Sequence, residues 1–261
     1  MLDILTVMWY VASVMTLSYG HLLYVMLIPW SIFSAINARG GVTLVLVVAI
    51  TASKLGGLSL KTIYSIMEHN GFEYIDLGLP SGLLWATCNV GAENPTDIGL
   101  YFQWGSVIGY TRNDALNNAK RFLPSSYDKS PMIRCAHSDS KTLGLDDDAA
   151  RFYMGGGWRM PTHDEYRELL DNTHINASNP NFHELISNTN WLSIILPNSG
   201  FLDGNYVFDA YKNIRLWTST LRGVNSIIVN RLGITNGFHS FSGVTGDYGF
   251  QIRGVVSKDD L

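Results

Sequence analysis

The sequence predicts an α+β fold, in which a domain of short antiparallel strands and two main helices follows hydrophobic helices at the N-terminus. The composition of the 261-residue chain changes near Phe72, where long apolar runs are replaced by short ones separated by Gly, Asn, Asp and Ser. This pattern is typical of short strands and loops. A strong helix start follows Pro161, and an Asn-Gly hairpin signal begins at Asn236. We therefore expect a hydrophobic segment over residues 1–61 and a folded domain over residues 72–257.

The hydrophobic segment has the character of a membrane anchor. Residues 4–38 contain no Asp, Glu, Lys or Arg, and this run exceeds the roughly 20 apolar residues that a helix needs to cross a bilayer. Asp3 and the long apolar core favour an uncleaved anchor over a secretory signal peptide. Pro29 is the expected kink. The aromatic residues suited to the membrane interface are Trp9, Tyr10, Tyr24 and Trp30.

A second apolar run, Val42–Ser53, is short for a membrane span. The span can continue to Leu60 if the side chain of Lys54 extends its charge to the membrane surface. We expect a membrane partner through residues 4–60 and a domain outside the cytoplasm. The few flanking charges leave the topology open. Two alternatives also stay open: translation that starts natively near Met67, and location on a phage particle.

Two helices are predicted in the domain. The first follows Leu145 over residues 146–152, with acidic residues that favour the positive end of a helix. The second begins with Thr162 and Glu165, which have the spacing of a capping box. Tyr166, Leu169 and Leu170 then recur at helical spacing and predict a buried face. Residues 181–187 are a weaker helix candidate.

The C-terminal third is predicted to be strands. Residues 226–230 are rich in β-branched side chains, and residues 238–244 can return after the Asn-Gly turn. Thr245-Gly246-Asp247 predicts another turn. Residues 248–256 then alternate, with Phe250, Ile252 and Val256 opposite Gln251 and Arg253. A small antiparallel sheet is the expected result.

Charge and cysteine content exclude some functions. From Thr62 onward the chain has 15 Lys+Arg and 21 Asp+Glu, a net charge of −6, which argues against unspecific nucleic-acid binding. Cys88 and Cys135 form no CxxC pattern. They are interpreted as unpaired thiols, with one disulfide as the alternative.

The candidate metal ligands do not converge in the sequence. The carboxylates of Asp146, Asp147 and Asp148 are adjacent, so a helix would point them in different directions, and a solvated helix start explains them better. The histidines lack HExxH spacing. We expect no metal, no cofactor and no catalytic residue.

Ordered motifs across residues 73–256 resemble a known family. They are Tyr74–Gly82, Leu84–Ala86, Asn89–Ala92, Gly99–Phe102, Trp104-Gly105, Asp147–Ala150, Gly156–Thr162, Glu165, Leu196-Pro197, Gly200-Phe201, Leu216–Ser219 and Tyr248–Arg253. In these the chain resembles the Fibrobacter succinogenes major paralogous domain, common in Bacteroidetes, which has a C-type-lectin-like fold. The family is related in fold to formylglycine-generating enzymes and to variable proteins of diversity-generating retroelements. Gly254 departs from the proline that is usual in the family.

The resemblance implies a C-type-lectin-like fold whose core contains the tryptophans Trp85, Trp104, Trp158 and Trp217. Calcium-dependent lectins carry a Glu-Pro-Asn or Gln-Pro-Asp triplet, whereas this chain has Glu93-Asn94-Pro95. Formylglycine-generating enzymes use a late cysteine pair, and no cysteine follows Cys135. The first departure argues against a calcium site, and the second favours a protein that is not an enzyme.

Residues 218–250 are the predicted binding face. In retroelement-diversified relatives, adenine-directed mutagenesis acts on codons that cannot yield Trp, Lys, Gln, Glu or Met, and this stretch contains none of the five. Its aromatic and adaptable polar side chains suit recognition. The predicted ligand-binding residues are Arg222, Asn225, Asn230, Arg231, Asn236, Phe238, His239 and Phe241. An ordinary strand-rich sheet with polar turns is the alternative.

The expected function is non-enzymatic binding and display, with a protein or a glycan as the unidentified ligand. A phage receptor-binding protein would use the same face. A structural surface or adhesin module would show no selective ligand. An oxidase of the formylglycine-generating type is the remaining alternative, and it would have to use Cys88 or Cys135.

Overall fold

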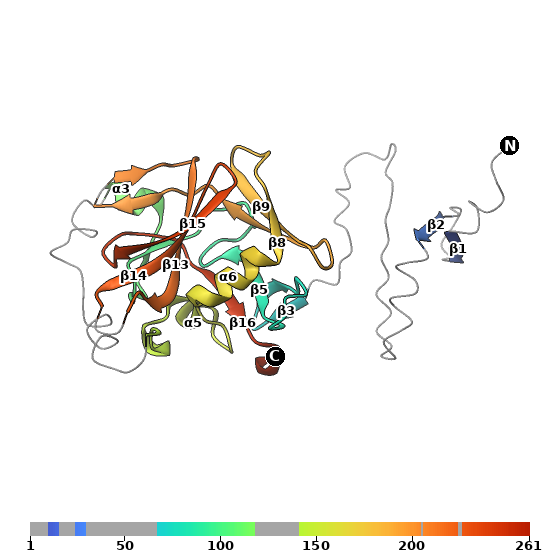
Figure 1. The fold of residues 1–261 in the computed structure, drawn as a ribbon, viewed down its shortest axis with the longest axis horizontal. Helices are drawn as coiled ribbons and strands as arrows, with labels where there is room; N and C mark the ends of the chain where they lie inside the picture. Colours follow the sequence, from blue (N-terminus) through green and yellow to red (C-terminus); the bar gives the residue numbers. More distant parts are fainter. Residues whose placement is uncertain (1–9, 16–23, 30–66, 118–140, 205, 224–225) are drawn as a thin grey trace. The chain divides into compact units, whose positions relative to one another are not determined.

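The computed structural model describes residues 10–15, 24–29, 67–117, 141–204, 206–223 and 226–261. The chain divides into two compact units, Met1–Ile66 and Met67–Leu261. The second unit contains small antiparallel sheets and few helices (Figure 1). The α+β class is therefore confirmed at the level of a mixed, strand-rich domain.

In the first unit, the described residues form two antiparallel strands, β1 (Tyr10–Met15) and β2 (Tyr24–Pro29). The prediction of helix is wrong for these two segments, whose Tyr, Val and Ile residues favour strands. The remainder of the predicted anchor, including the run at 42–60, lies outside the described residues. Among the described residues, no helix combines the length and apolarity that crossing a bilayer requires.

The second unit begins and ends in one four-stranded sheet, ordered β16-β5-β4-β3. Its strands are β3 (Met67–His69), β4 (Phe72–Ile75), β5 (Leu84–Asn89) and β16 (Arg253–Val256). Asn70 and Gly71 join β3 to β4 with φ of 51° and 82°, the left-handed conformation that tight hairpin turns use. All pairings in the sheet are antiparallel.

The next segment is a short hairpin, β6 (Tyr101–Phe102) and β7 (Gly109–Tyr110), followed by α3 (Arg112–Asn117). After residues 118–140, a 3₁₀ turn η2 (Leu145–Asp147) leads into α5 (Ala149–Met154). The helix predicted at 146–152 therefore starts three residues later.

Asp148 explains the shifted start of α5, because its side chain caps the helix. Its Oδ1 accepts the N–H of Arg151 at 3.0 Å, and its Oδ2 accepts the N–H of Met160 at 2.8 Å. Burial raises the pKa of Asp148, although these N–H groups favour the charged form. Of the three adjacent aspartates, Asp148 thus caps α5, and the other two lie in the preceding 3₁₀ turn.

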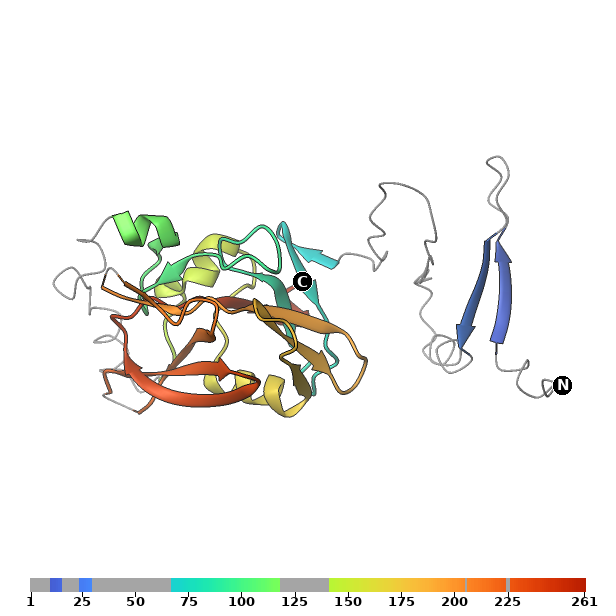
Figure 2. The ribbon, with the colours of Figure 1, turned by 90° about the horizontal axis from the view of Figure 1, so that it is seen from above.

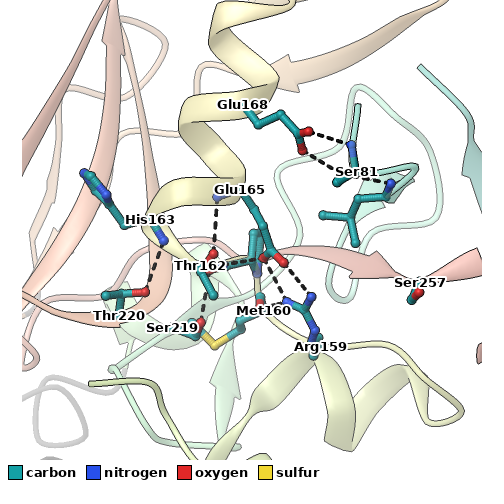
Figure 3. A network of polar contacts seen from close by, with 12 residues as sticks. Ser81, Arg159, Met160, Thr162, His163, Glu165, Glu168, Ser219, Thr220 and Ser257 are labelled. Atoms are coloured by element: carbon teal, nitrogen blue, oxygen red, sulfur yellow. Dashed lines mark hydrogen bonds and ion pairs between the residues drawn. The ribbon is translucent and has the colours of Figure 1, made fainter. Parts of the chain in front are cut away.

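The capping-box prediction is confirmed in α6 (His163–Asp171), where Thr162 and Glu165 each accept the other's backbone N–H. Glu165 also binds Arg159 at 2.6 Å (Figure 3). Tyr166, Leu169 and Leu170 are buried as predicted. Helix α6 is therefore fixed at its first turn by side chains and along its length by the core.

A three-stranded sheet ordered β10-β9-β8 follows α6. Its strands are β8 (Thr173–Asn176), β9 (Phe182–Ser187) and β10 (Ser193–Pro197). The helix predicted at 181–187 is wrong, because this segment is β9. Buried and half-buried positions alternate along β9. The sequence does not show this as an apolar-polar alternation, because the buried positions include polar His183 and Ser187 as well as Leu185.

The C-terminal third contains the hairpin β11 (Phe201–Asp203) and β12 (Tyr206–Phe208), and then a sheet ordered β13-β14-β15. Strands β13 (Asn213–Leu221), β14 (Ile228–Thr235) and β15 (Phe238–Thr245) are antiparallel. The predicted Asn-Gly hairpin is confirmed, with φ of 50° at Asn236 and 80° at Gly237. Figure 2 shows this hairpin as an outer layer of the domain.

The strand predicted over 248–256 is confirmed only at β16. Residues Gly249, Phe250 and Gln251 instead make isolated bridges to three separate segments. Both sets of alternating side chains are buried there, including Gln251 and Arg253 at 0% exposure. The period-two pattern therefore belongs to a segment that is buried on both sides, and not to a strand with one face in solvent. The last turn is η3 (Lys258–Asp260).

The core confirms the prediction for the four tryptophans, since each is 0% exposed. Trp104 donates its Nε1–H to the carbonyl of Thr218 at 2.8 Å, and Trp217 donates to that of Phe102 at 2.7 Å. These bonds tie segments more than a hundred residues apart in the chain. Buried indole N–H groups usually have such partners, although the Trp85 Nε1–H has none among the described residues.

Arg253 is a fully buried cation in this core. It donates to Asn89 Oδ1 at 3.0 Å, to the Ala86 carbonyl at 2.8 Å and to the Ile195 carbonyl at 2.7 Å, and it also bonds the Thr87 carbonyl. Loss of hydration lowers the pKa of Arg253 to about 10. One side chain thus holds β16, β5 and β10 together.

Candidate functional site

The predicted ligand-binding residues on β14 and β15 lie on opposite faces of the sheet. Successive side chains of a strand alternate, so the observed register places Asn230, His239 and Phe241 on one face and Arg231 and Phe238 on the other. The predicted residues therefore do not share one face of the sheet, and their role in binding stays a prediction. The two faces have separate environments.

The first face is partly covered by α6. Phe241 is half-buried against the core, and its ring centre lies 4.5 Å from that of His163. Arg222 lies over Gly243, where an added Cβ would come within 2.9 Å of its Cδ. This face offers polar side chains, and none of Arg222, Asn230, His239 and Phe241 lines either of the two cavities described below. Asn225 lies outside the described residues.

Asn236 borders a cavity of about 440 Å³, which we call the turn pocket. It lies between the Asn236-Gly237 turn, the start of β13 and the segments flanking β9. Four asparagines and one exposed tyrosine contribute to it. Its lining residues are Ala177, Asn179, Pro180, His183, Asn198, Tyr211, Lys212, Asn213, Thr235 and Asn236.

Two hydrogen-bonded groups of residues form the floor of the turn pocket. His183 Nε2 accepts the N–H of Gly237 at 3.1 Å, and its Nδ1 lies 2.8 Å from Asn198 Oδ1. This pairing assigns the proton of the neutral ring to Nδ1. Thr235 donates to Asn213 Oδ1 at 2.7 Å. The floor is thus fixed before any ligand arrives.

The rim of the turn pocket has free polar groups. Tyr211 is 56% exposed, and Asn236 and Lys212 are exposed too. In the part of the chain that the structure describes, neither the Asn236 amide nor the Lys212 ammonium has a partner. Arg112 donates to the Tyr211 hydroxyl at 2.8 Å. The rim can therefore offer donors, an acceptor and an aromatic ring to one ligand.

Sequence reasoning found Asn236 but missed the other pocket residues. Tyr211 has a φ of 64° and an exposed ring. No local sequence pattern predicts a turn at this residue. His183 and Asn198 come from a segment predicted to be helix or loop. A surplus of asparagines between 172 and 236 was the available signal, because amides are common in binding surfaces.

Arg231 lies on a different cavity, of about 310 Å³, which we call the aromatic pocket. Four aromatic rings and the side chain of Arg215 also line it. Phe238, at the start of β15, is 81% exposed and lines neither cavity. The predicted residues that the structure describes therefore belong to four different surroundings: the first face of the sheet, the turn pocket, the aromatic pocket and the exposed start of β15.

The described residues contain no cluster of three or more His, Cys, Asp or Glu that could hold a metal ion. Cys88 on β5 is a free, half-buried thiol. Burial raises its pKa, which disfavours the reactive thiolate. Cys135 lies outside the described residues.

No protein-family profile matches the chain, and neither does any curated protein or solved structure. The resemblance to C-type-lectin-like paralogous domains therefore stays a prediction.

Proposed function

We propose that this protein is a non-enzymatic ligand-binding domain that recognises a glycan in the turn pocket. The observation that carries the proposal is the rim, where Tyr211, Lys212 and Asn236 surround a cavity with a fixed floor. A pocket with few convergent polar groups and a preformed shape is typical of small-ligand sites.

The chemistry of the rim suits sugar hydroxyl groups. A hydroxyl both donates and accepts a hydrogen bond, and the Asn236 amide offers both functions within one group. The Tyr211 ring adds an apolar face beside a polar tip. The cavity volume of about 440 Å³ falls in the range of small-molecule sites. One or two sugar units are the expected occupants.

A glycan array with the full-length chain in detergent tests the proposal. Tyr211→Ala should abolish array binding. Trp191→Ala is the matched control, because Trp191 is also an exposed aromatic residue with a φ of 64° and lies outside the pocket. Equal loss in both variants, or a wild-type protein without any glycan signal, contradicts the proposal.

A second candidate, recognition of a protein, has one observation in its favour. Phe238 is 81% exposed beside the hairpin turn, and exposed aromatic anchors are typical of protein interfaces. Protein binding that fails in Phe238→Ser but survives in Tyr211→Ala would favour this candidate. A structural adhesin module predicts that neither variant changes a selective interaction.

We further propose a C-type-lectin-like fold, display on a bacterial surface through residues 4–60, and retroelement diversification of residues 218–250. Location on a phage particle is the alternative. Membrane fractionation with mass spectrometry of the N-terminus tests the anchor, and a start near Met67 would exclude it. A near-repeat of codons 218–250 that differs only at adenines would support diversification.

The proposal excludes an oxidase of the formylglycine-generating type. Such an enzyme would consume oxygen with a thiol peptide through Cys88 or Cys135. Oxygen uptake that disappears in Cys88→Ser or in Cys135→Ser would overturn the non-enzymatic assignment.

A further inference from the structure

Two arginines converge on the floor of the aromatic pocket. Arg215 on β13 pairs with Gly233 on β14, and Arg231 is two residues before that glycine on the same face. A Cβ at position 233 would lie 2.5 Å from Arg231 Nη1 and 3.0 Å from Arg215 Nη1. The two guanidinium groups therefore crowd together over Gly233, and any larger residue there would displace them.

Neither guanidinium has an ion pair among the described residues. Arg215 Nη1 donates only to the neighbouring Ile214 carbonyl at 3.1 Å, while the buried Nη1 of Arg231 has no partner. Ser242, which pairs with Arg231 across the strands, also has a buried hydroxyl without a partner. Unpaired buried polar groups are costly, so their retention points to a ligand.

The electrostatics agree with this geometry. Burial, and then the charge of Arg215, lower the pKa of Arg231 to about 10. Burial also lowers the pKa of Arg215, and only Asp209 opposes that change. The protein therefore holds two like charges close together without compensating them fully.

Aromatic rings form the wall of the pocket. Phe201 and Phe208 stack at 5.5 Å, and Tyr248 and Phe250 stack at 5.8 Å. The guanidinium carbon of Arg231 lies 5.9 Å from the Phe250 ring centre. This wall favours a ligand with a flat or apolar body next to its charge.

Two carboxylates on the pocket lining limit the charge of the ligand. Asp203 is exposed, and Asp209 accepts the side-chain N–H of Asn213 at 2.5 Å. A dianion such as phosphate would meet stronger repulsion from them than a monoanion would. A carboxylate fits best, because it matches the planar donor geometry of a guanidinium.

We propose that the aromatic pocket binds a carboxylate attached to a ring, with Arg231 and Arg215 as the carboxylate ligands and the aromatic wall against the ring. The site is separate from the turn pocket, and the Asp209–Asn213 hydrogen bond lies between them. The two proposals can therefore fail independently.

Titration of the full-length chain with benzoate and benzamide, followed by ligand-observed NMR, tests the site. Benzoate should bind saturably and neutral benzamide should not. Arg231→Gln should weaken benzoate by about tenfold to a hundredfold, the range for a lost charged hydrogen bond. Exposed Arg167 on α6 provides the matched control, so Arg167→Gln should bind as wild type does. Equal binding of benzoate and benzamide, or equal affinity in the two variants, overturns the proposal.

A stability readout separates ligand binding from a structural role. If Arg231 serves a ligand, Arg231→Gln should raise the melting temperature of the ligand-free protein, because it removes like-charge repulsion. A lower melting temperature would assign Arg231 to packing against Phe250 and overturn the proposal. Arg215→Gln is measured in parallel and should give the same increase, because it removes the same repulsion.

A third ligand identifies the source of the carboxylate. Glucuronate carries the group on a sugar ring, and benzoate carries it on an aromatic ring. Tighter binding of glucuronate supports an acidic sugar, and tighter binding of benzoate supports a small aromatic acid. Failure of both ligands overturns the site but leaves the turn pocket and its Tyr211→Ala test unaffected.

Discussion

Replacement of Arg253 by Met should cost the domain roughly 3–5 kcal/mol of unfolding free energy, because it leaves several buried acceptors without a donor. The side chain bonds Asn89 Oδ1 and the carbonyls of Ala86, Thr87 and Ile195. Met leaves these four acceptors buried, at about 1–3 kcal/mol each. Burial lowers the pKa of Arg253 to about 10, so removal of the charge offsets part of this loss. The loss exceeds this gain.

Urea unfolding followed by tryptophan fluorescence measures the change. The midpoint should fall while the m-value stays constant, since the same surface is exposed on unfolding. Arg253→Lys should lose nearly as much, because a compact ammonium group cannot reach acceptors on two separate strands. Arg167→Met on the exposed face of α6 is the control. A loss below about 1 kcal/mol, or full rescue by Lys, would refute the reasoning.

Three further predictions concern other parts of the domain. The pKa of Glu165 is lowered, because bonds from Arg159 and Thr162 outweigh the effect of burial. Its stabilisation is thus present above the ordinary value of 4.5 and is lost as pH falls through the folded value. Arg159→Gln should cost about 1–2 kcal/mol at neutral pH, since both groups are partly exposed, and the difference from wild type should shrink in acid unfolding curves. His183→Phe should cost about 1–3 kcal/mol by calorimetry and broaden the hairpin-turn amide signals, because one turn N–H loses its acceptor. Gly200→Ala should cost more than about 2 kcal/mol in urea unfolding, since φ is 65° and the added Cβ would lie 2.2 Å from the Phe208 carbonyl oxygen; unchanged stability would show that this loop can move.

Local signals in the sequence predicted the local structures well. The capping box at Thr162 and the turn at Asn236-Gly237 each depend on residues within a few positions of one another, and both are confirmed. The segment 181–187 was predicted wrongly because β9 buries His183, whose partner Gly237 lies 54 residues away. A polar residue that is satisfied by distant groups has no local signature.

The site was predicted in part for the same reason. Asn236 and Arg231 each line a cavity, but the register places Arg231 on the face opposite Asn230. A one-residue step in a strand reverses the face, so a list of adjacent polar residues does not define a surface. Tyr211 enters the turn pocket through an unusual backbone conformation, which the sequence does not encode in a recognisable pattern.

The sheet that holds both ends of the domain is distinct from the sheet that lines the pockets. Strands β3 and β16 belong to the first, and β13 and β14 to the second. Because its first and last strands lie in one sheet, we expect the domain to tolerate insertion into a host chain as a unit. Because the hairpin belongs to the other sheet, we also expect substitutions around it to leave the connections to a host chain unaffected.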